Sequence, residues 1–252
     1  MNPVLFSRRI LFTIAIFVIF SAALRAQLPE PPAATFRILS LIGSRTDLKY
    51  EPVYGKPPEP LHLFQAVSRA YPLPRNGRLE LFREIPPPPD APRGTPHKRE
   101  IFLTAQIPAG AKQSLVIVWP AGKNVRGPLS ARVLPDDPAR HLARSVQVLN
   151  LSRFPSSVAL GAEHFDFAAG ESRLVPITEG RLRILVQAAI KKDTQWESVY
   201  RAERRIGEKL RGFIFVCDFM QDPDYDTDPQ PPPVLVKSFF EPAPEPPVLA
   251  RR

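Results

Sequence analysis

Short apolar and β-branched runs recur along the chain from residue 36 onward, and each is closed by Pro, Gly, Asn or Asp. Strand-length runs separated by such turn residues are typical of an all-β sandwich or barrel. They are too numerous for one seven-stranded sandwich, so the pattern predicts an all-β fold with two β-sandwich domains. The candidate strands are residues 36–42, 48–53, 61–67, 78–85, 99–107, 113–119, 129–134, 145–151, 157–160, 164–168, 171–177, 182–190, 197–202, 211–219 and 234–240.

Alternation of side chains supports this prediction and distinguishes two kinds of strand. In the run 78–85, Leu79 and Leu81 point to the opposite face from Glu80 and Phe82, as in a strand with one buried face. The runs 115–119 and 213–216 are instead apolar on both faces. We expect these two to be central strands that are covered on both sides and that mark the two cores.

Helical patterns are weak in this sequence. The best window is 197–210, where Val199, Ala202, Ile206 and Leu210 have approximately helical spacing, so a short helix competes with the strand there. A single helical turn is possible over 139–144, because Asp and Pro precede it in the order of a helix start.

The first residues, 1–26, have the three-part layout of a secretory signal peptide. Arg8 and Arg9 precede an apolar stretch over 10–24, and small residues lead to a cleavage site after Ala26. The stretch is shorter than the roughly 20 residues that a spanning helix needs, although an uncleaved anchor is the alternative. We therefore expect an exported protein of the periplasm, the outer-membrane surface or the exterior, with no membrane span after cleavage.

Proline clusters divide the rest of the chain. The segment 134–140 interrupts the β pattern near the middle of the mature chain and is the predicted domain boundary. Residues 86–96 form a polyproline-type excursion between two strands. The predicted parts are an extended N-terminal segment at 27–34, a first sandwich at 35–134, a second at 140–240, and a Pro-rich C-terminal tail at 241–252 that packs little.

Composition and charge narrow the class of protein. Proline accounts for 32 of the 252 residues, which argues against a mainly helical fold, and the single cysteine excludes an intrachain disulfide and Cys-rich zinc modules. Loss of residues 1–26 removes three arginines and no acid, so the net charge falls from +9 to +6. The basic residues are scattered and lack the interleaved aromatic residues of a nucleic-acid surface. We expect a solvated basic surface and no nucleic-acid partner.

A faint internal echo joins the two halves. Residues 76–81 read Asn-Gly-Arg-Leu-Glu-Leu and residues 179–184 read Glu-Gly-Arg-Leu-Arg-Ile, each a turn glycine followed by an alternating strand. The echo has two interpretations, an ancient repeat or the chance recurrence of a turn-strand unit.

Several segments resemble a group of uncharacterised exported bacterial proteins that are rich in β-structure. The second half carries Val-Gln-Val-Leu-Asn-Leu-Ser at 146–152 and Ala-Gly-Glu-Ser-Arg-Leu-Val-Pro at 169–176. In the first half, 48–51, 68–71 and 79–83 fit the same group. The resemblance implies paired immunoglobulin-like β-domains with no assigned activity, and it transfers no catalytic residue.

Motifs for catalysis are missing from the sequence. The four histidines have no metal-ligand spacing, Ser172 lacks the second glycine of a nucleophile elbow, and no Gly-rich phosphate loop occurs. Cys217 lies in an apolar run, where a buried small hydrophobic residue is the favoured interpretation over a reactive thiol. We expect no enzymatic activity, although carboxylates brought together by folding leave an envelope hydrolase as a minor alternative.

One acidic segment could carry specific chemistry. Asp222, Asp224, Asp226 and Asp228 alternate, so in a curved loop their carboxylates would converge on a hard cation such as calcium. The competing interpretation is an acidic, solvated loop before the prolines at 231–233. We expect no other cofactor.

These observations favour a non-catalytic structural or protein-binding component of the bacterial cell envelope. The alternative is a carbohydrate- or surface-binding module, assisted by calcium, for which Trp196 beside Tyr200 would supply an exposed aromatic platform. Its partner would be a protein or a polysaccharide of the envelope.

Overall fold

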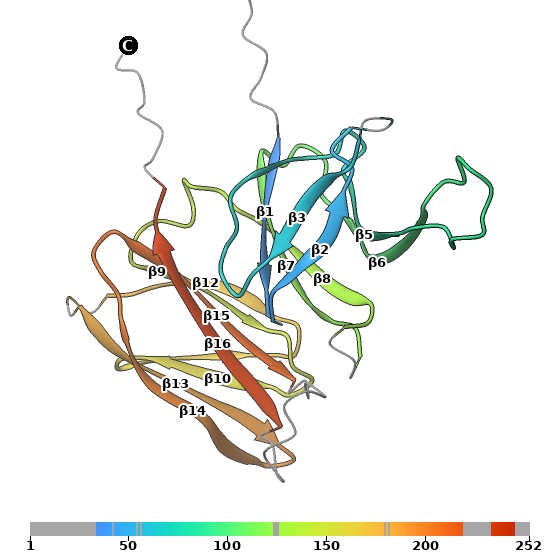
Figure 1. The fold of residues 1–252 in the computed structure, drawn as a ribbon. Coiled ribbons are helices and arrows are strands. Elements are labelled where there is room, and N and C mark those ends of the chain that lie inside the picture. The colour runs from blue at the N-terminus through green and yellow to red at the C-terminus, as the bar shows by residue number, and fades with distance from the viewer. Residues whose placement is uncertain are drawn as a thin grey trace, which may run out of the picture. The chain divides into compact units, whose positions relative to one another are not determined.

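The computed structural model describes residues 34–41, 43–53, 55, 57–122, 126–178, 180, 182–218 and 233–244, all within one compact unit, 34–252. The described residues contain sixteen strands in four four-stranded sheets and no helix (Figure 1). The prediction of an all-β fold with two sandwiches is therefore confirmed. No described segment is a helix long and apolar enough to cross a membrane, and the predicted signal peptide lies outside the described residues.

The first sandwich is built from β1 to β8, drawn from blue to green in Figure 1. One sheet has the order β4-β1-β7-β8 and the other β3-β2-β5-β6. The strands are β1 (Thr35–Ser40), β2 (Arg45–Tyr50), β3 (Glu59–Leu63), β4 (Tyr71–Pro72), β5 (Arg78–Ile85), β6 (Lys98–Gln106), β7 (Gln113–Pro120) and β8 (Leu129–Pro135).

The second sandwich follows from β9 to β16, drawn from yellow to red. Its sheets have the orders β12-β9-β15-β16 and β11-β10-β13-β14. The strands are β9 (Ser145–Asn150), β10 (Ser156–Leu160), β11 (Glu163–Phe167), β12 (Ser172–Pro176), β13 (Arg183–Lys192), β14 (Gln195–Arg205), β15 (Leu210–Asp218) and β16 (Val234–Pro242).

The two sandwiches have one topology, because adding eight to every strand number of the first reproduces the second. Each contains a single parallel pair, β1 with β7 and β9 with β15. The echoed segments 76–81 and 179–184 lead into β5 and β13, which are equivalent strands. This equivalence favours an internal repeat over chance.

Each sandwich encloses its own core between its two sheets. Strand β13 illustrates how the sequence specifies this, since Ile184, Val186, Ala188 and Ile190 alternate with more exposed residues and all enter the second core. In β5, Leu79 and Leu81 enter the first core as predicted.

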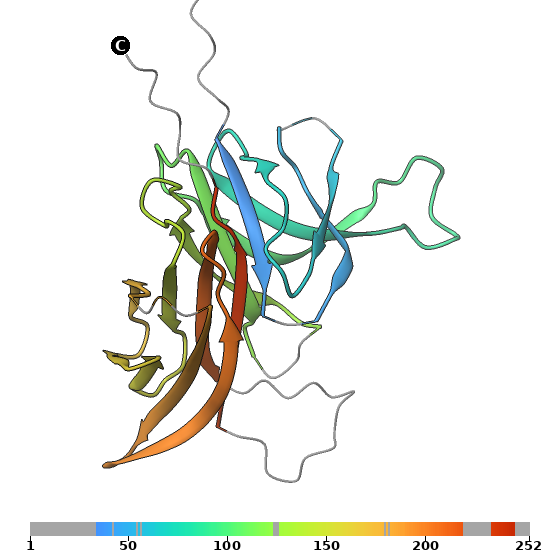
Figure 2. The same ribbon diagram turned by 90° about the vertical axis from the view of Figure 1, so that its left-hand side faces the viewer.

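A third apolar cluster joins the two sandwiches. It lies between sheets β4-β1-β7-β8 and β12-β9-β15-β16, which pack through the faces turned away from their own cores (Figure 2). The doubly apolar strands β7 and β15 are therefore covered on both sides as predicted, but one side of each marks the interface rather than a core. The buried members of this cluster are Leu39, Leu41, Leu115, Ile117, Leu134, Leu149, Phe213, Phe215 and Cys217.

Two expectations need correction. The alternative of a short helix over 197–210 is wrong, because β14 pairs with β13 from Gln195 to Arg205 with one bulge, and tertiary pairing overrides a weak helical pattern. Strand β16 runs to Pro242, two residues into the expected tail, because Glu241 and Pro242 pair with β15. Strand β4 has only two residues and gave no periodic pattern to predict it.

Candidate functional site

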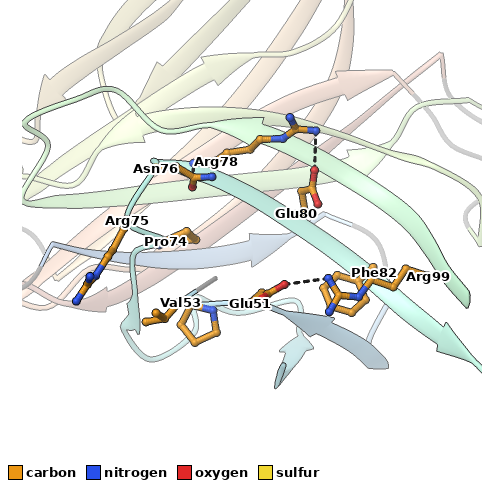
Figure 3. A pocket seen from close by; sticks show the side chains of 10 residues that line it. Glu51, Val53, Pro74, Arg75, Asn76, Arg78, Glu80, Phe82 and Arg99 are labelled. Carbon is orange, nitrogen blue, oxygen red and sulfur yellow. Dashed lines mark hydrogen bonds and ion pairs between the residues drawn. The ribbon is translucent and has the colours of Figure 1, made fainter. Parts of the chain in front are cut away.

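A pocket of about 440 Å³ lies on the outer face of sheet β3-β2-β5-β6 (Figure 3). Its volume lies in the range of small-ligand sites. Its wall comes from the end of β2, the β4–β5 turn and strands β5 and β6. The lining residues are Glu51, Pro52, Val53, Pro74, Arg75, Asn76, Arg78, Glu80, Phe82 and Arg99.

The turn at Asn76 and Gly77 starts strand β5, which supplies three of the ten residues that line the pocket. Gly77 has a φ of +68°, which disfavours other residues, and the backbone N–H of Arg78 donates to Asn76 Oδ1 over 2.9 Å. From there the period of two sends Arg78, Glu80 and Phe82 to the outer face while the leucines between them enter the core.

The floor of the pocket is held by a cation and an aromatic ring. The Arg99 guanidinium lies 4.4 Å from the centroid of Phe82, which is only 1% exposed, and its Nη1 donates to Glu51 Oε2 over 2.9 Å. The hydrogen bond from Arg99, and then that from the Gly55 backbone N–H, lower the pKa of Glu51. Glu51 thus stays ionised and keeps Arg99 in place (Figure 3).

The charges in the pocket are mostly paired before any ligand arrives. Arg78 forms a second ion pair with Glu80 at 2.6 Å, whereas Arg75 makes no ion pair or side-chain hydrogen bond with another described residue. Three arginines against two glutamates leave one excess positive charge beside an apolar wall. Such an arrangement can bind an amphipathic group, but a carboxylate held ionised by arginine is a poor proton shuttle.

A second ionic cluster lies at the junction of the two sandwiches. We call Arg37, Asp136, Arg211 and Glu241 the interface tetrad. Arg37 Nε donates to Asp136 Oδ2 over 2.7 Å, and its terminal nitrogens donate to both oxygens of Glu241 over 2.8 and 2.9 Å. Arg211 Nε donates to Glu241 Oε1 over 2.8 Å, and Arg211 Nη2 lies 2.9 Å from Asp136 Oδ1.

Burial makes these ion pairs stronger than surface pairs. The side chains of Arg211 and Asp136 are 2% and 1% exposed. Burial is the largest single influence and would lower the pKa of Arg37 and raise that of Glu241. The hydrogen bonds and opposite charges of the tetrad together outweigh it, so the pKa of Arg37 is raised and that of Glu241 is lowered. Lys237 Nζ adds a hydrogen bond to the Leu41 carbonyl oxygen over 2.6 Å, from β16 to the chain just after β1.

His141 lies beside this tetrad, edge-on to the ring of Phe213 with 4.8 Å between centroids. Burial, followed by the charge of Arg211, lowers its pKa to about 4, so the ring is neutral at pH 7. It also lines a smaller cavity of about 250 Å³ together with Asp137 and Ser172.

These three residues do not form a catalytic triad in the described structure. Asp137 Oδ1 accepts from the backbone N–H of Ala139, and no hydrogen bond between described residues joins Ser172 to His141. A histidine with a pKa of about 4 is also a weak general base.

The predicted calcium ligands Asp222, Asp224, Asp226 and Asp228 lie outside the described residues. Within the described ranges, no group of three or more His, Cys, Asp or Glu side chains is placed to hold a metal ion. That the chain has no enzymatic activity, and no cofactor apart from possible calcium, stays a prediction.

The structure also places Cys217, Trp196 and Tyr200, which the sequence analysis named. Cys217 is 1% exposed, which confirms that it is a buried small side chain, and burial raises the pKa of its thiol to about 12. Trp196 is 49% exposed, but Tyr200 packs against the second core and accepts a hydrogen bond from Arg204. The two do not form one exposed platform.

No family model matches the chain, and no curated protein sequence matches it significantly. The pocket and the tetrad were not predicted, because folding gathers their residues from distant segments. One available signal was Arg37, which shares a strand face with Leu39 and Leu41 in the sequence pattern.

Proposed function

We propose that this chain is an exported, non-catalytic protein-binding component of the bacterial cell envelope. The observation that carries the proposal is the placement of its ionisable groups. The groups with the most displaced pKa values, Tyr50, His141 and Cys217, are buried in the first core or where the sandwiches meet, whereas the pocket presents two arginine–glutamate ion pairs. Catalytic sites usually place perturbed groups in the accessible cleft.

We also propose that the sandwiches are immunoglobulin-like in architecture rather than in strand order. The constant-type immunoglobulin sandwich keeps its first two strands as neighbours in one sheet. Here β1 and β2 belong to different sheets, while β2 and β5 are neighbours as in that fold. This supports a likeness at the level of two packed antiparallel-rich sheets.

The test is chemical crosslinking of residues 27–252 in the native envelope, followed by purification under denaturing conditions. We expect one defined protein partner, with its yield reduced by Arg99→Ala in the pocket and unchanged by Arg183→Ala, which breaks an exposed ion pair with Glu203. Recovery of polysaccharide alone, or of nothing above background, would contradict the proposal. Repetition with a calcium chelator tests the role of residues 222–228.

The second candidate function is carbohydrate binding, favoured by the half-exposed ring of Trp196. Purified envelope polysaccharide should then quench tryptophan fluorescence, and Trp196→Ala should abolish binding. Tyr200→Phe is the matched control, because its ring packs inward.

A further inference from the structure

The loop between β5 and β6 projects away from both sheets in Figure 1 and Figure 2. We call residues 86–97 the proline arm. Most of its residues are exposed and none is buried. The hydrogen bonds it makes with described residues stay inside it, so the sandwich core does not explain its presence.

The arm is nevertheless held in shape by its own sequence. Prolines occupy 86–89, 92 and 96, which fixes φ at those positions and restricts each preceding residue to extended conformations. A turn closes where the Ala91 N–H donates to the Pro88 carbonyl oxygen over 3.0 Å. A second turn places Gly94 at a φ of +90°.

Thr95 completes the second turn, because both its backbone N–H and its hydroxyl donate to the Pro92 carbonyl oxygen, over 3.1 and 2.7 Å. A segment with this many fixed dihedrals loses less conformational entropy on binding than a flexible loop does.

The chemistry of the arm selects among possible partners. It contains no Phe, Tyr or Trp to stack on sugars, and Asp90 balances Arg93, which gives little attraction to a charged surface. It also lacks large apolar side chains that would enter a bilayer. Three consecutive prolines, 86–88, precede the turn and would span about 9 Å as a polyproline II helix, which fits a groove of aromatic rings.

Apolar surface continues to the base of the arm. Ile85 at the end of β5 is 37% exposed and Ile101 in β6 is 51% exposed, and both belong to the hairpin that carries the arm. They would add contact area at the edge of such a groove.

We propose that the proline arm is a preformed docking peptide for a groove lined by aromatic side chains on a partner protein. This inference rests on the proposed protein-binding function and names the surface and the kind of partner. No residue of the arm lines the pocket, so variants of the two can be tested separately.

The experiment places a photo-crosslinking amino acid at Arg93 in the mature chain within the native envelope. The same group at Arg183, on the second sandwich, is the control position. We expect crosslinks from position 93 to map to a peptide rich in Trp, Tyr or Phe in one protein. A synthetic peptide of residues 84–99 should compete with them.

Paired substitutions test the role of the proline rings. The double substitution Pro87→Ser and Pro88→Ser should lower the yield of crosslinked partner about tenfold. The double substitution Pro57→Ser and Pro58→Ser, in the β2–β3 connection, should leave that yield unchanged. The unfolding midpoint of each variant is measured first. The arm variant should keep the wild-type midpoint, because no hydrogen bond between described residues joins the arm to the sandwich.

Three outcomes overturn the inference: the arm variant crosslinks as well as wild type, the crosslinks map to a surface without aromatic residues, or they map to lipid or polysaccharide. If the first outcome occurs but whole-chain crosslinking still recovers a protein partner, only the inference about the arm fails and the proposed function stands. If the unmodified chain captures no protein from any position, both proposals fail.

Discussion

Asp136 and Glu241 occupy the same position in the two sandwiches, and each contacts both Arg37 and Arg211. Asp136 follows Pro135, which pairs with Ser114 of β7. Glu241 follows Phe240, which pairs with Gly212 of β15. Ser114 and Gly212 in turn pair with the second residues of β1 and β9. The repeated topology therefore delivers two equivalent acids to one place.

Replacement of Arg211 should strongly destabilise the fold. Arg211→Met leaves the buried carboxylate of Asp136 and the half-buried one of Glu241 with one arginine. We expect a loss of about 3–5 kcal/mol in the free energy of unfolding, measured by urea denaturation. The control Arg183→Met removes an exposed pair and should cost below about 1 kcal/mol. Equal effects of the two substitutions would show that the tetrad contributes no more than a surface ion pair.

The apolar interface between the sandwiches should contribute as much to the free energy of unfolding as a sandwich core does. Phe215 is fully buried between the sandwiches, so Phe215→Ala should cost about 3–5 kcal/mol in the same measurement. Leu182→Ala, at a half-exposed side chain, should change stability by less than about 0.5 kcal/mol. A small effect at Phe215 would mean that the two sandwiches are joined loosely.

Acid should weaken the fold partly through His141. Its folded pKa of about 4 lies below the ordinary value of 6.5, so the unfolded chain binds a proton at a pH where the folded chain does not. Stability should therefore fall by up to about 3 kcal/mol as the pH drops from 6.5 to 4, with no further contribution below that.

The matched variants isolate this effect in denaturation curves at several pH values. His141→Gln should flatten the pH dependence in that window, while His97→Gln, in the exposed proline arm, should not. Glu241, whose pKa is lowered in the fold, adds a loss only at pH values below its ordinary 4.5. An unchanged profile for His141→Gln would assign the acid sensitivity to carboxylates.

The thiol of Cys217 should be inert in the folded protein. It is buried and its pKa is raised to about 12 by burial, so little thiolate forms and reagents cannot reach it. Reaction with a disulfide reagent should follow the unfolding rate and become fast in denaturant. Rapid modification of the native protein would show that Cys217 is not buried.

The sequence was informative where the information is local. Alternation identified the buried face of β5, and doubly apolar runs identified β7 and β15 as covered on both sides, because side-chain period and strand length are properties of neighbouring residues. Cys217 was likewise interpretable from its apolar surroundings.

The pocket and the tetrad required the fold. Glu51 and Arg99 lie 48 positions apart in the sequence, and Arg37 and Asp136 lie 99 positions apart. No local pattern encodes which distant carboxylate will meet which arginine. Arg37 itself was recognisable as a charge on an apolar face, but its partners were not.

The bond between Arg37 and Glu241 joins residues 204 positions apart, on the first strand and the last, β1 and β16. During synthesis, the arginine emerges early and its carboxylate partner emerges near the end. Until then, the apolar face of the first sandwich that will form the interface stays uncovered, and Arg37 lacks its second carboxylate partner. If the chain crosses a membrane with its N-terminus leading, as its first residues predict, this junction closes only after the final strand has arrived on the far side.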